Sequence, residues 1–182
     1  MDFAQIAKWL DGHSEDMVEL QRQLTAIPAL NPEAGGQGEW RKARFLENWL
    51  SDHGLGPAEH HDTPDDRLEE GTRPNFVVRV EGEENAPTLW LMTHMDVVPP
   101  GEQRDDGSWP GWNSDPFVLY REDDRIYGRG VEDNQQSMVA GIFAVLALLE
   151  YGLKPQRPLA LLFVSGEEMG SEYGLKPLLE NK

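Results

Sequence analysis

The sequence contains no cysteine, which excludes several kinds of chemistry at once. Without thiols the chain has no cysteine nucleophile, no disulfide and no cysteine-type zinc site. A bound metal ion would have to be held by histidine and carboxylate side chains, which are harder ligands than thiolates. The sequence also lacks a Gly-x-Ser-x-Gly motif, the elbow that presents a serine nucleophile in many hydrolases.

Positive charge is scarce: 16 Lys and Arg residues stand against 33 Asp and Glu residues, for a net charge of −17. Such a surface repels phosphate backbones and anionic lipids, so we expect neither nucleic acid nor a membrane as a partner. Most of these carboxylates are expected to form a solvated surface. A site that gathers cations would use only a few of them.

Long apolar runs are also missing, and none approaches the length that crosses a bilayer. Residues 1–5 lack the basic region followed by an apolar stretch that marks a signal peptide, so we expect a cytoplasmic protein. The 182 residues, 38% of them hydrophobic, suit one soluble globular domain with a proper core.

The spacing of apolar residues predicts an α/β fold. Two nearly unbroken apolar runs have the character of central strands that are covered on both faces. Helices and strands alternate along the chain, which favours a three-layer sandwich with a mostly parallel central sheet. The expected helices are 2–25 with a break near Gly12, 39–53, 137–151 and 172–179; the expected strands are 75–80, 88–93 and 159–164, with a hairpin formed by 117–120 and 125–127.

Polar residues follow both central strands at the point where each strand ends. His94 and Asp96 come directly after the strand 88–93, and Glu167 and Glu168 come after the next central strand. In open α/β sheets the carboxyl ends of the strands line the ligand crevice. We therefore expect these two clusters of metal-capable residues to meet at one edge of the sheet.

Each motif taken alone has an ordinary interpretation. For an isolated His94-x-Asp96 pair, a core histidine with satisfied ring nitrogens is the more common outcome. The adjacent carboxylates of Glu167 and Glu168 repel each other unless a cation or proton compensates, but a solvated loop pair is an equal alternative. Asp133, at the entry to a buried helix, is either an N-cap or a carboxylate that bridges two cations.

Three segments together resemble a known family: LMTHMDVVP at 91–99, YGRGVED at 127–133 and FVSGEEMGS at 163–171. They are similar, in order and spacing, to the zinc-dependent acylase, dipeptidase and carboxypeptidase family. Its members include acetylornithine deacetylase, succinyl-diaminopimelate desuccinylase, aminoacylase and glutamate carboxypeptidase. The resemblance implies a zinc-exopeptidase-like sandwich, present here in incomplete form.

The resemblance also implies a role for each residue. His94 ligates one metal ion, Glu168 ligates a second, and Asp133 bridges both, with a cis peptide expected after it. Glu167 is implied as the general base and Asp96 as the residue that orients the histidine. Two divalent ions are expected, zinc first and cobalt or manganese as alternatives. The implied reaction is hydrolysis of an amide bond in a dipeptide or N-acyl amino acid by a metal-activated water.

The sequence departs from the family pattern in three respects. Thr93 stands where glycine is common, and Gln135 and Gln136 stand where Lys-Gly is frequent. The family's remaining carboxylate and histidine ligands, and the lid domain that usually mediates dimerisation, lie downstream of the matched motifs. We therefore expect residues 1–182 to be the N-terminal portion of the catalytic domain, with three of the five metal ligands. This portion alone is expected to be inactive and to bind metal weakly.

Two other classes of function compete with the metallohydrolase hypothesis. A non-catalytic, truncated domain retained for its fold or for partner binding is the main alternative. A metal-dependent phosphoesterase also uses His and Asp clusters, but it gives no reason for the Glu167-Glu168 pair. Within the leading class, dipeptidase and deacylase are not separated by the sequence, and homodimerisation of the full-length protein stays open.

Overall fold

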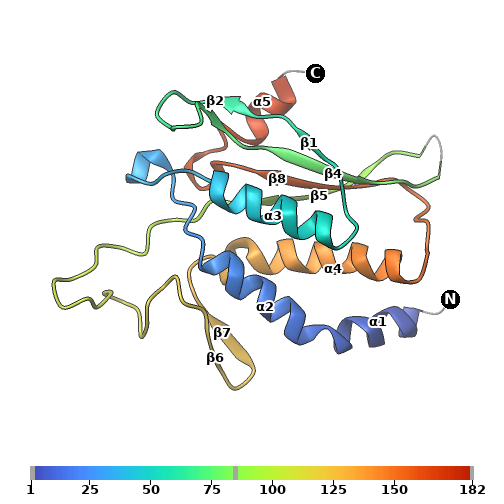
Figure 1. Ribbon diagram of the computed structural model, residues 1–182, viewed down its shortest axis with the longest axis horizontal. Coiled ribbons are helices and arrows are strands. Elements are labelled where there is room, and N and C mark those ends of the chain that lie inside the picture. The colour runs from blue at the N-terminus through green and yellow to red at the C-terminus, as the bar shows by residue number, and fades with distance from the viewer. Residues whose placement is uncertain (1–2, 84–85, 181–182) are drawn as a thin grey trace.

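A four-stranded sheet runs through the computed structural model, which describes residues 3–83 and 86–180 (Figure 1). Strand β4 pairs antiparallel with both β1 and β8, whereas β8 and β5 pair in parallel. Three of the four strands therefore run in one direction, and β4 is the reversed strand. In order across the sheet, the strands are β1 (Ala58–His60), β4 (Phe76–Val80), β8 (Leu159–Val164) and β5 (Leu89–His94).

Helices lie on both faces of this sheet. Four of them cover one face, and a short helix lies over the other (Figure 1). Successive residues of a strand point to opposite faces, so β8 contributes to two separate apolar clusters, one on each side. This arrangement confirms the predicted α/β sandwich. The helices are α1 (Phe3–Gly12), α2 (Ser14–Thr25), α3 (Trp40–Asp52) and α4 (Gln136–Glu150) on the first face and α5 (Leu175–Glu180) on the second.

Most of the predicted helices form within one or two residues of their expected bounds. The chain leaves helix α1 after Gly12 and starts α2 at Ser14, as the glycine indicated. Helix α4 is apolar around most of its circumference because it packs between the sheet and helices α1 and α2. It stops before Gly152, whose φ of 59° is costly for other residues. Helix α5 starts later than predicted, at Leu175.

Strand β5 corrects the prediction that the run 88–93 is central and covered on both faces. In the described residues β5 is an edge strand, paired only with β8. Its face away from α4 leaves Trp90 and Met92 each 46% exposed. An apolar run indicates that burial of the strand is favourable, but it does not determine how many neighbouring elements cover the strand. By contrast, β8 is buried along its whole length, as predicted.

Two small hairpins flank the sheet. The predicted hairpin turns at Asp123 as expected, but its first strand starts at Tyr120 rather than at Phe117. The preceding loop 99–119 runs far out from the sheet (Figure 1). The two hairpins are β2 (Thr63–Pro64) with β3 (Thr72–Arg73) and β6 (Tyr120–Glu122) with β7 (Arg125–Tyr127).

None of the described helices combines the length and apolar character needed to cross a membrane.

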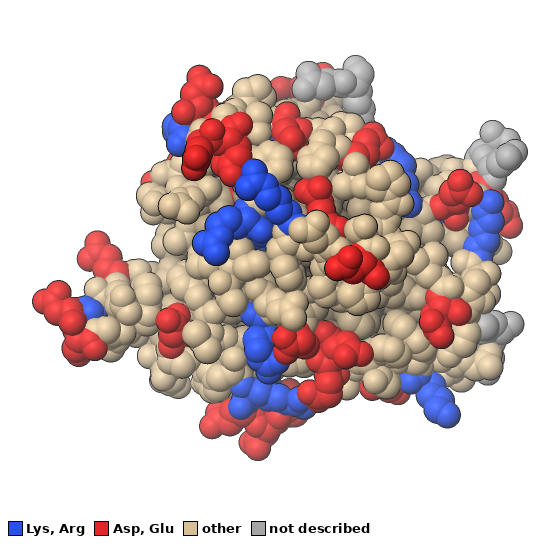
Figure 2. All heavy atoms as spheres, in the orientation of Figure 1, with Lys and Arg blue, Asp and Glu red and all other residues tan. Residues whose placement is uncertain are grey.

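Charge is distributed over the surface much as the composition indicates. Figure 2 shows acidic side chains spread over one face of the molecule, with fewer basic groups among them. Dispersed exposed carboxylates are well solvated and interact weakly with one another. The carboxylates that matter for a site are therefore those that the fold brings together out of the bulk solvent.

Candidate metal centre

The parallel pairing of β5 and β8 brings the two predicted clusters together. In this pairing His94, the last residue of β5, lies opposite Val164, the last residue of β8. Three residues beyond Val164 the chain makes the short turn η3 (Glu167–Met169), which carries Glu167 and Glu168. Both clusters therefore lie at the same end of the sheet, beyond the carboxyl ends of β5 and β8, as the rule for strand ends predicts.

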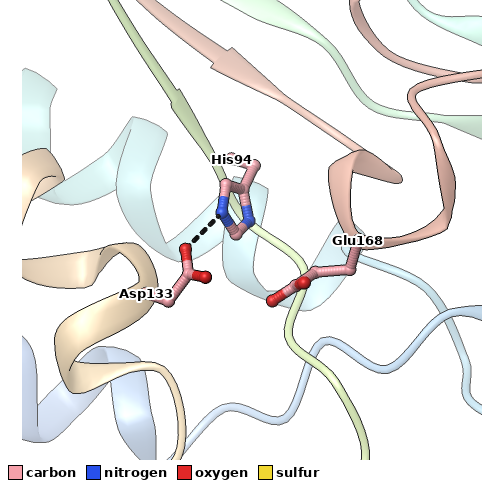
Figure 3. A group of neighbouring side chains, drawn as sticks. All are labelled: His94, Asp133 and Glu168. Carbon is pink, nitrogen blue, oxygen red and sulfur yellow. Dashed lines mark hydrogen bonds and ion pairs between the residues drawn. The ribbon is translucent and has the colours of Figure 1, made fainter.

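Asp133 reaches this edge from a different element. It lies in the turn η2 (Val131–Gln135) between the hairpin β6–β7 and helix α4. Its backbone is not helical, with φ −117° and ψ 98°, and the Asp133–Asn134 peptide is cis, as the family resemblance implied. The N-cap of α4 is Gln135, so the interpretation of Asp133 as an ordinary helix cap is wrong. Its side chain points toward His94 instead (Figure 3).

Three side chains form a group that could hold a cation. One ligand atom each from His94, Asp133 and Glu168 lies within 4.8 Å of the others. Figure 3 shows the two carboxylates directed toward the imidazole from opposite sides. The imidazole Nε2 and the Asp133 Oδ1 are 3.0 Å apart. One imidazole and two carboxylates are a donor set that divalent metal ions commonly take.

The group borders an open cavity through its two carboxylates. His94 is only 5% exposed, whereas the Asp133 side chain is 66% exposed. A cavity of about 290 Å³ adjoins the group and is lined by Arg129, Asp133 and Glu168, among others. Asp133 and Glu168 are therefore accessible to a small molecule, whereas the imidazole is buried behind them.

Hydrogen bonding fixes which nitrogen of His94 faces the group. The ring Nδ1 lies 3.0 Å from the backbone oxygen of Asp96. A carbonyl oxygen can only accept, so Nδ1 must carry a proton and donate it. The other nitrogen, Nε2, then faces Asp133 and is the one available to a metal ion.

The electrostatic field at the site favours a positive charge. Burial lowers the pKa of His94, but the hydrogen bonds and charge of Asp96 and Asp133 outweigh it and raise that pKa to about 9. Burial and the negative charge of Asp133 both raise the pKa of Glu168. A histidine that gains a proton and a carboxylate that resists losing one both indicate uncompensated negative charge. A divalent cation fits this donor set and this charge.

Asp96 lies beneath the group and holds it in a way that the sequence did not indicate. Its carboxylate is 3.5 Å from His94 Nδ1, farther than its own backbone oxygen. The carboxylate instead accepts hydrogen bonds from the backbone N–H groups of Glu167 and Glu168, each at 3.1 Å. Asp96 therefore joins the two strand ends, and its backbone rather than its side chain makes the shorter contact to the histidine.

Glu167 stands beside the group rather than within it. Its Oε2 lies 3.8 Å from His94 Nε2, and its side chain is 49% exposed. All five residues that the sequence singled out are thus brought to one place. The other histidines lie elsewhere: His13, His53, His60 and His61.

Sequence reasoning missed the buried polar residues that lie behind the site. Arg73 and Glu39 are both 0% exposed and bonded to each other, although charged side chains are normally exposed. Asn31 is 2% exposed and donates a hydrogen bond to Asp96. Its only sequence signal was Asn31-Pro32, which indicates a turn. The partners lie tens of residues apart, so no spacing rule connects them.

Comparisons with known proteins agree with the three motifs. The model of peptidase family M20/M25/M40 matches residues 90–182. The chain is 33% identical over 175 residues to an uncharacterized metallohydrolase of Methanocaldococcus jannaschii, covering 92% of this chain and 40% of that protein. It is 34% identical over 166 residues to a succinyl-diaminopimelate desuccinylase of Gluconobacter oxydans, covering 91% of this chain and 38% of that protein. The chain thus spans about 40% of the length of these relatives.

A solved structure shows the same fold. Human carnosine dipeptidase 1 matches with a TM-score of 0.78 at 24% sequence identity. The match covers 98% of this chain and 37% of that chain. The predicted architecture is therefore one that a known dipeptidase also adopts over the matched part.

Proposed function

The chain belongs to peptidase family M20/M25/M40, and from this membership and the geometry of the site we propose that it carries part of the centre of a metal-dependent amide hydrolase. The observation that supports this most directly is the convergence of His94, Asp133 and Glu168, whose ligand atoms lie within 4.8 Å of one another. These residues come from three separate elements, two of them the ends of neighbouring parallel strands.

We propose a distinct role for each ligand. His94 would offer Nε2 to one divalent ion, and Glu168 would offer a carboxylate oxygen to a second. Asp133, whose exposed carboxylate has two oxygens, would be shared between the two ions. Zinc is the metal proposed first, because imidazole and carboxylate oxygen are its usual ligands in catalytic sites, with cobalt or manganese as alternatives. Such ions would activate a water and polarise the amide carbonyl.

Glu167 is proposed as the general base. Its side chain stands beside His94 and is half exposed, so it is accessible to a water molecule and to a substrate from the open side. A carboxylate in this position takes a proton from the attacking water and returns it to the leaving amine nitrogen. Asp96 is proposed to orient His94, chiefly through its backbone oxygen.

The proposed substrate is a dipeptide or an N-acyl amino acid. The names of a desuccinylase relative and of a dipeptidase with the same fold support these two classes. Because the chain spans about 40% of the relatives' length, we propose that residues 1–182 form the N-terminal portion of a longer catalytic unit. Further ligands in the remaining part would complete the site, and the portion alone would not turn over substrate.

Metal binding by the 182-residue chain tests the site itself. We expect zinc to bind by isothermal titration calorimetry, weakly because the ligand set is partial, and His94→Ala to abolish this binding. His61→Ala, which removes an exposed histidine outside the group, is the matched control and should leave zinc binding unchanged. Equal zinc affinity in the wild type and in His94→Ala would contradict the proposed centre.

Activity is tested in the full-length protein. We expect hydrolysis of a dipeptide or of an N-acetyl or N-succinyl amino acid after loading with zinc, cobalt or manganese. Glu167→Gln should lower kcat by about 100-fold or more, since general acid–base catalysis contributes on the order of 10²–10⁴-fold. A metal-loaded protein that hydrolyses none of these amides would favour the non-catalytic alternative.

A further inference from the structure

A buried polar network lies directly behind the proposed metal centre. Four of its side chains are almost inaccessible to solvent: Arg73 and Glu39 are 0% exposed, Asp96 is 1% exposed and Asn31 is 2% exposed. Charged side chains are rarely buried to this extent unless they are paired and hydrogen bonded. The fold therefore places a specific set of partners here.

The hydrogen bonds of the network run in one donor-to-acceptor direction, from Arg73 to Asn31 and from Asn31 to Asp96. Arg73 donates to both carboxylate oxygens of Glu39 and also to Oδ1 of Asn31. A guanidinium group can only donate, so the oxygen of the Asn31 amide must face it. The amide nitrogen of Asn31 then faces the other way and donates to Asp96 Oδ2 at 2.9 Å.

The two buried carboxylates hold three successive backbone N–H groups. Glu39 Oε1 accepts from Gly166 at 3.2 Å. The carboxylate of Asp96 accepts from Glu167 and from Glu168 at 3.1 Å each. These three amides form the start of the turn η3 that presents both glutamate side chains to the site. The orientation of this turn is therefore set by the carboxylates of Glu39 and Asp96, which the network holds in place.

We propose that Asn31 and Arg73 are positioning residues, which act through Asp96 to hold the Glu167-Glu168 turn against His94. This proposal rests on the proposed function, because it concerns how the same metal centre is kept in place. Residues that orient metal ligands from behind typically contribute 10–100-fold to metal affinity. The side-chain hydrogen bonds of both residues go to Asp96, Glu39 and each other, so their effect on the ligands passes through the two carboxylates.

Asn31→Leu tests the proposal, because leucine has a similar volume and can neither donate to Asp96 nor accept from Arg73. We expect zinc affinity of the 182-residue chain to fall by about 10–100-fold. The absorption spectrum of the Co²⁺-loaded chain should also change, since it reports the geometry of the ligands. Arg79→Met is the matched control: Arg79 also binds a carboxylate and stacks over an aromatic ring, but its partners, Glu59 and Trp90, lie outside the network.

Hydrogen exchange of the backbone amides gives a readout that needs no metal. In Asn31→Leu the amides of Glu167 and Glu168 should exchange at least 10-fold faster than in the wild type. The amide of Met95, which bonds to a strand carbonyl, is the internal reference and should not change. If Asn31→Leu does not fold, Arg73→Lys replaces it, because lysine keeps the charge but lacks the fork that binds both partners.

Three outcomes would overturn the proposal. The first is wild-type exchange at Glu167 and Glu168 in a folded Asn31→Leu or Arg73→Lys variant. The second is wild-type zinc affinity in such a variant. The third is an equal loss of affinity in Arg79→Met, which would indicate general destabilisation. A wild-type chain that binds no zinc would overturn the proposed function instead, and the exchange experiment would still decide the positioning role.

Discussion

Negative charge is compensated differently on the two sides of the site. The buried side consists of Arg73, Glu39, Asn31 and Asp96, and the open side consists of His94, Asp133 and Glu168. On the buried side, Asp96 and Glu39 are surrounded by donors, and Arg73 supplies a permanent positive charge within the network. On the open side, Asp133 and Glu168 converge on His94, and their side chains are accessible to solvent. The first group is neutralised by the protein itself, whereas the second is arranged for a cation from outside.

The pKa shifts of two nearby carboxyl groups reflect this difference. Burial acts to raise the pKa of Asp96, but the nearby imidazole of His94 and the hydrogen bond from Asn31 outweigh it, so that the pKa lies below its usual value. For Glu168, burial and the charge of Asp133 raise the pKa together. Burial alone would raise both. At Asp96 the hydrogen-bond donors outweigh burial, whereas at Glu168 the positive charge of His94 does not.

Replacing Arg73 should have the largest effect on stability, because it removes the cation of the buried side. We expect Arg73→Met to lower the free energy of unfolding by about 3–5 kcal/mol, since it leaves the carboxylate of Glu39 buried without its partner. Arg79→Met, which breaks an exposed contact to Glu59, should cost only about 1 kcal/mol or less. Urea unfolding of both variants measures the difference, and equal losses would mean that Arg73 contributes no more to stability than an exposed ion pair does.

Lys42 gives a pH-dependent test of the buried side. Burial lowers its pKa from 10.5 to about 8, against the opposing charges of Asp96 and Glu39. Between pH 8 and 10.5 the unfolded chain binds a proton at this lysine that the folded chain does not, so stability contributed by Lys42 rises with pH. The rise should reach about 3 kcal/mol at most.

Two lysine variants isolate this contribution. Lys42→Met should remove the rise between pH 8 and 10.5, when unfolding in urea is compared with that of the wild type at each pH. Lys154→Met removes an exposed lysine and should keep the rise. If Lys42→Met follows the same pH profile as the wild type, Lys42 does not titrate in this window.

The sequence predicted the open side of the site but, of the buried side, only Asp96. His94, Asp133 and Glu168 follow strand ends or precede a helix, and their positions in three motifs give a local signal that a single sequence carries. Asn31 and Arg73 carry no such signal, because their roles depend on partners 65 and 34 residues away. A charged residue is normally exposed, so its burial becomes visible only once the chain is folded.

The same limit applies to the fold. Period and composition predicted helix α4 and strand β8 almost to the residue, because each is surrounded by its own chain on most sides. Strand β5 has the same apolar character, yet one of its faces is partly exposed in the described residues. Local patterns report what a segment prefers, whereas burial also depends on which other segments arrive beside it.

Zinc should stabilise the chain through the open side alone. A ligand that binds only the folded state adds about 2.7 kcal/mol at a concentration of 100 times its Kd. We expect a rise in Tm on adding zinc to the wild type and a much smaller one in Asp133→Asn, because the neutral amide oxygen is a far weaker ligand than a carboxylate. The shift should persist in Asp16→Asn, an exposed acidic residue on helix α2. A zinc-dependent shift in Asp133→Asn equal to that of the wild type would remove Asp133 from the ligand set.

The smallest expected effect is also the one that separates the two sides most directly. In the absence of metal, Glu168→Gln should raise the free energy of unfolding at pH 7 by under about 1 kcal/mol, because it removes a charge that repels Asp133 in a half-buried position. The raised pKa of Glu168 gives the sign: ionisation costs more in the folded chain, so stability from this group increases as the pH falls through its folded pKa.

Asp96→Asn should instead lower the free energy of unfolding, since the ionised carboxylate is the form that accepts from Asn31, Glu167 and Glu168. Urea unfolding in the presence of a chelator compares the two variants. Destabilisation by both would mean that the open side is satisfied by the protein itself, and that the excess of negative charge there does not serve to attract a cation.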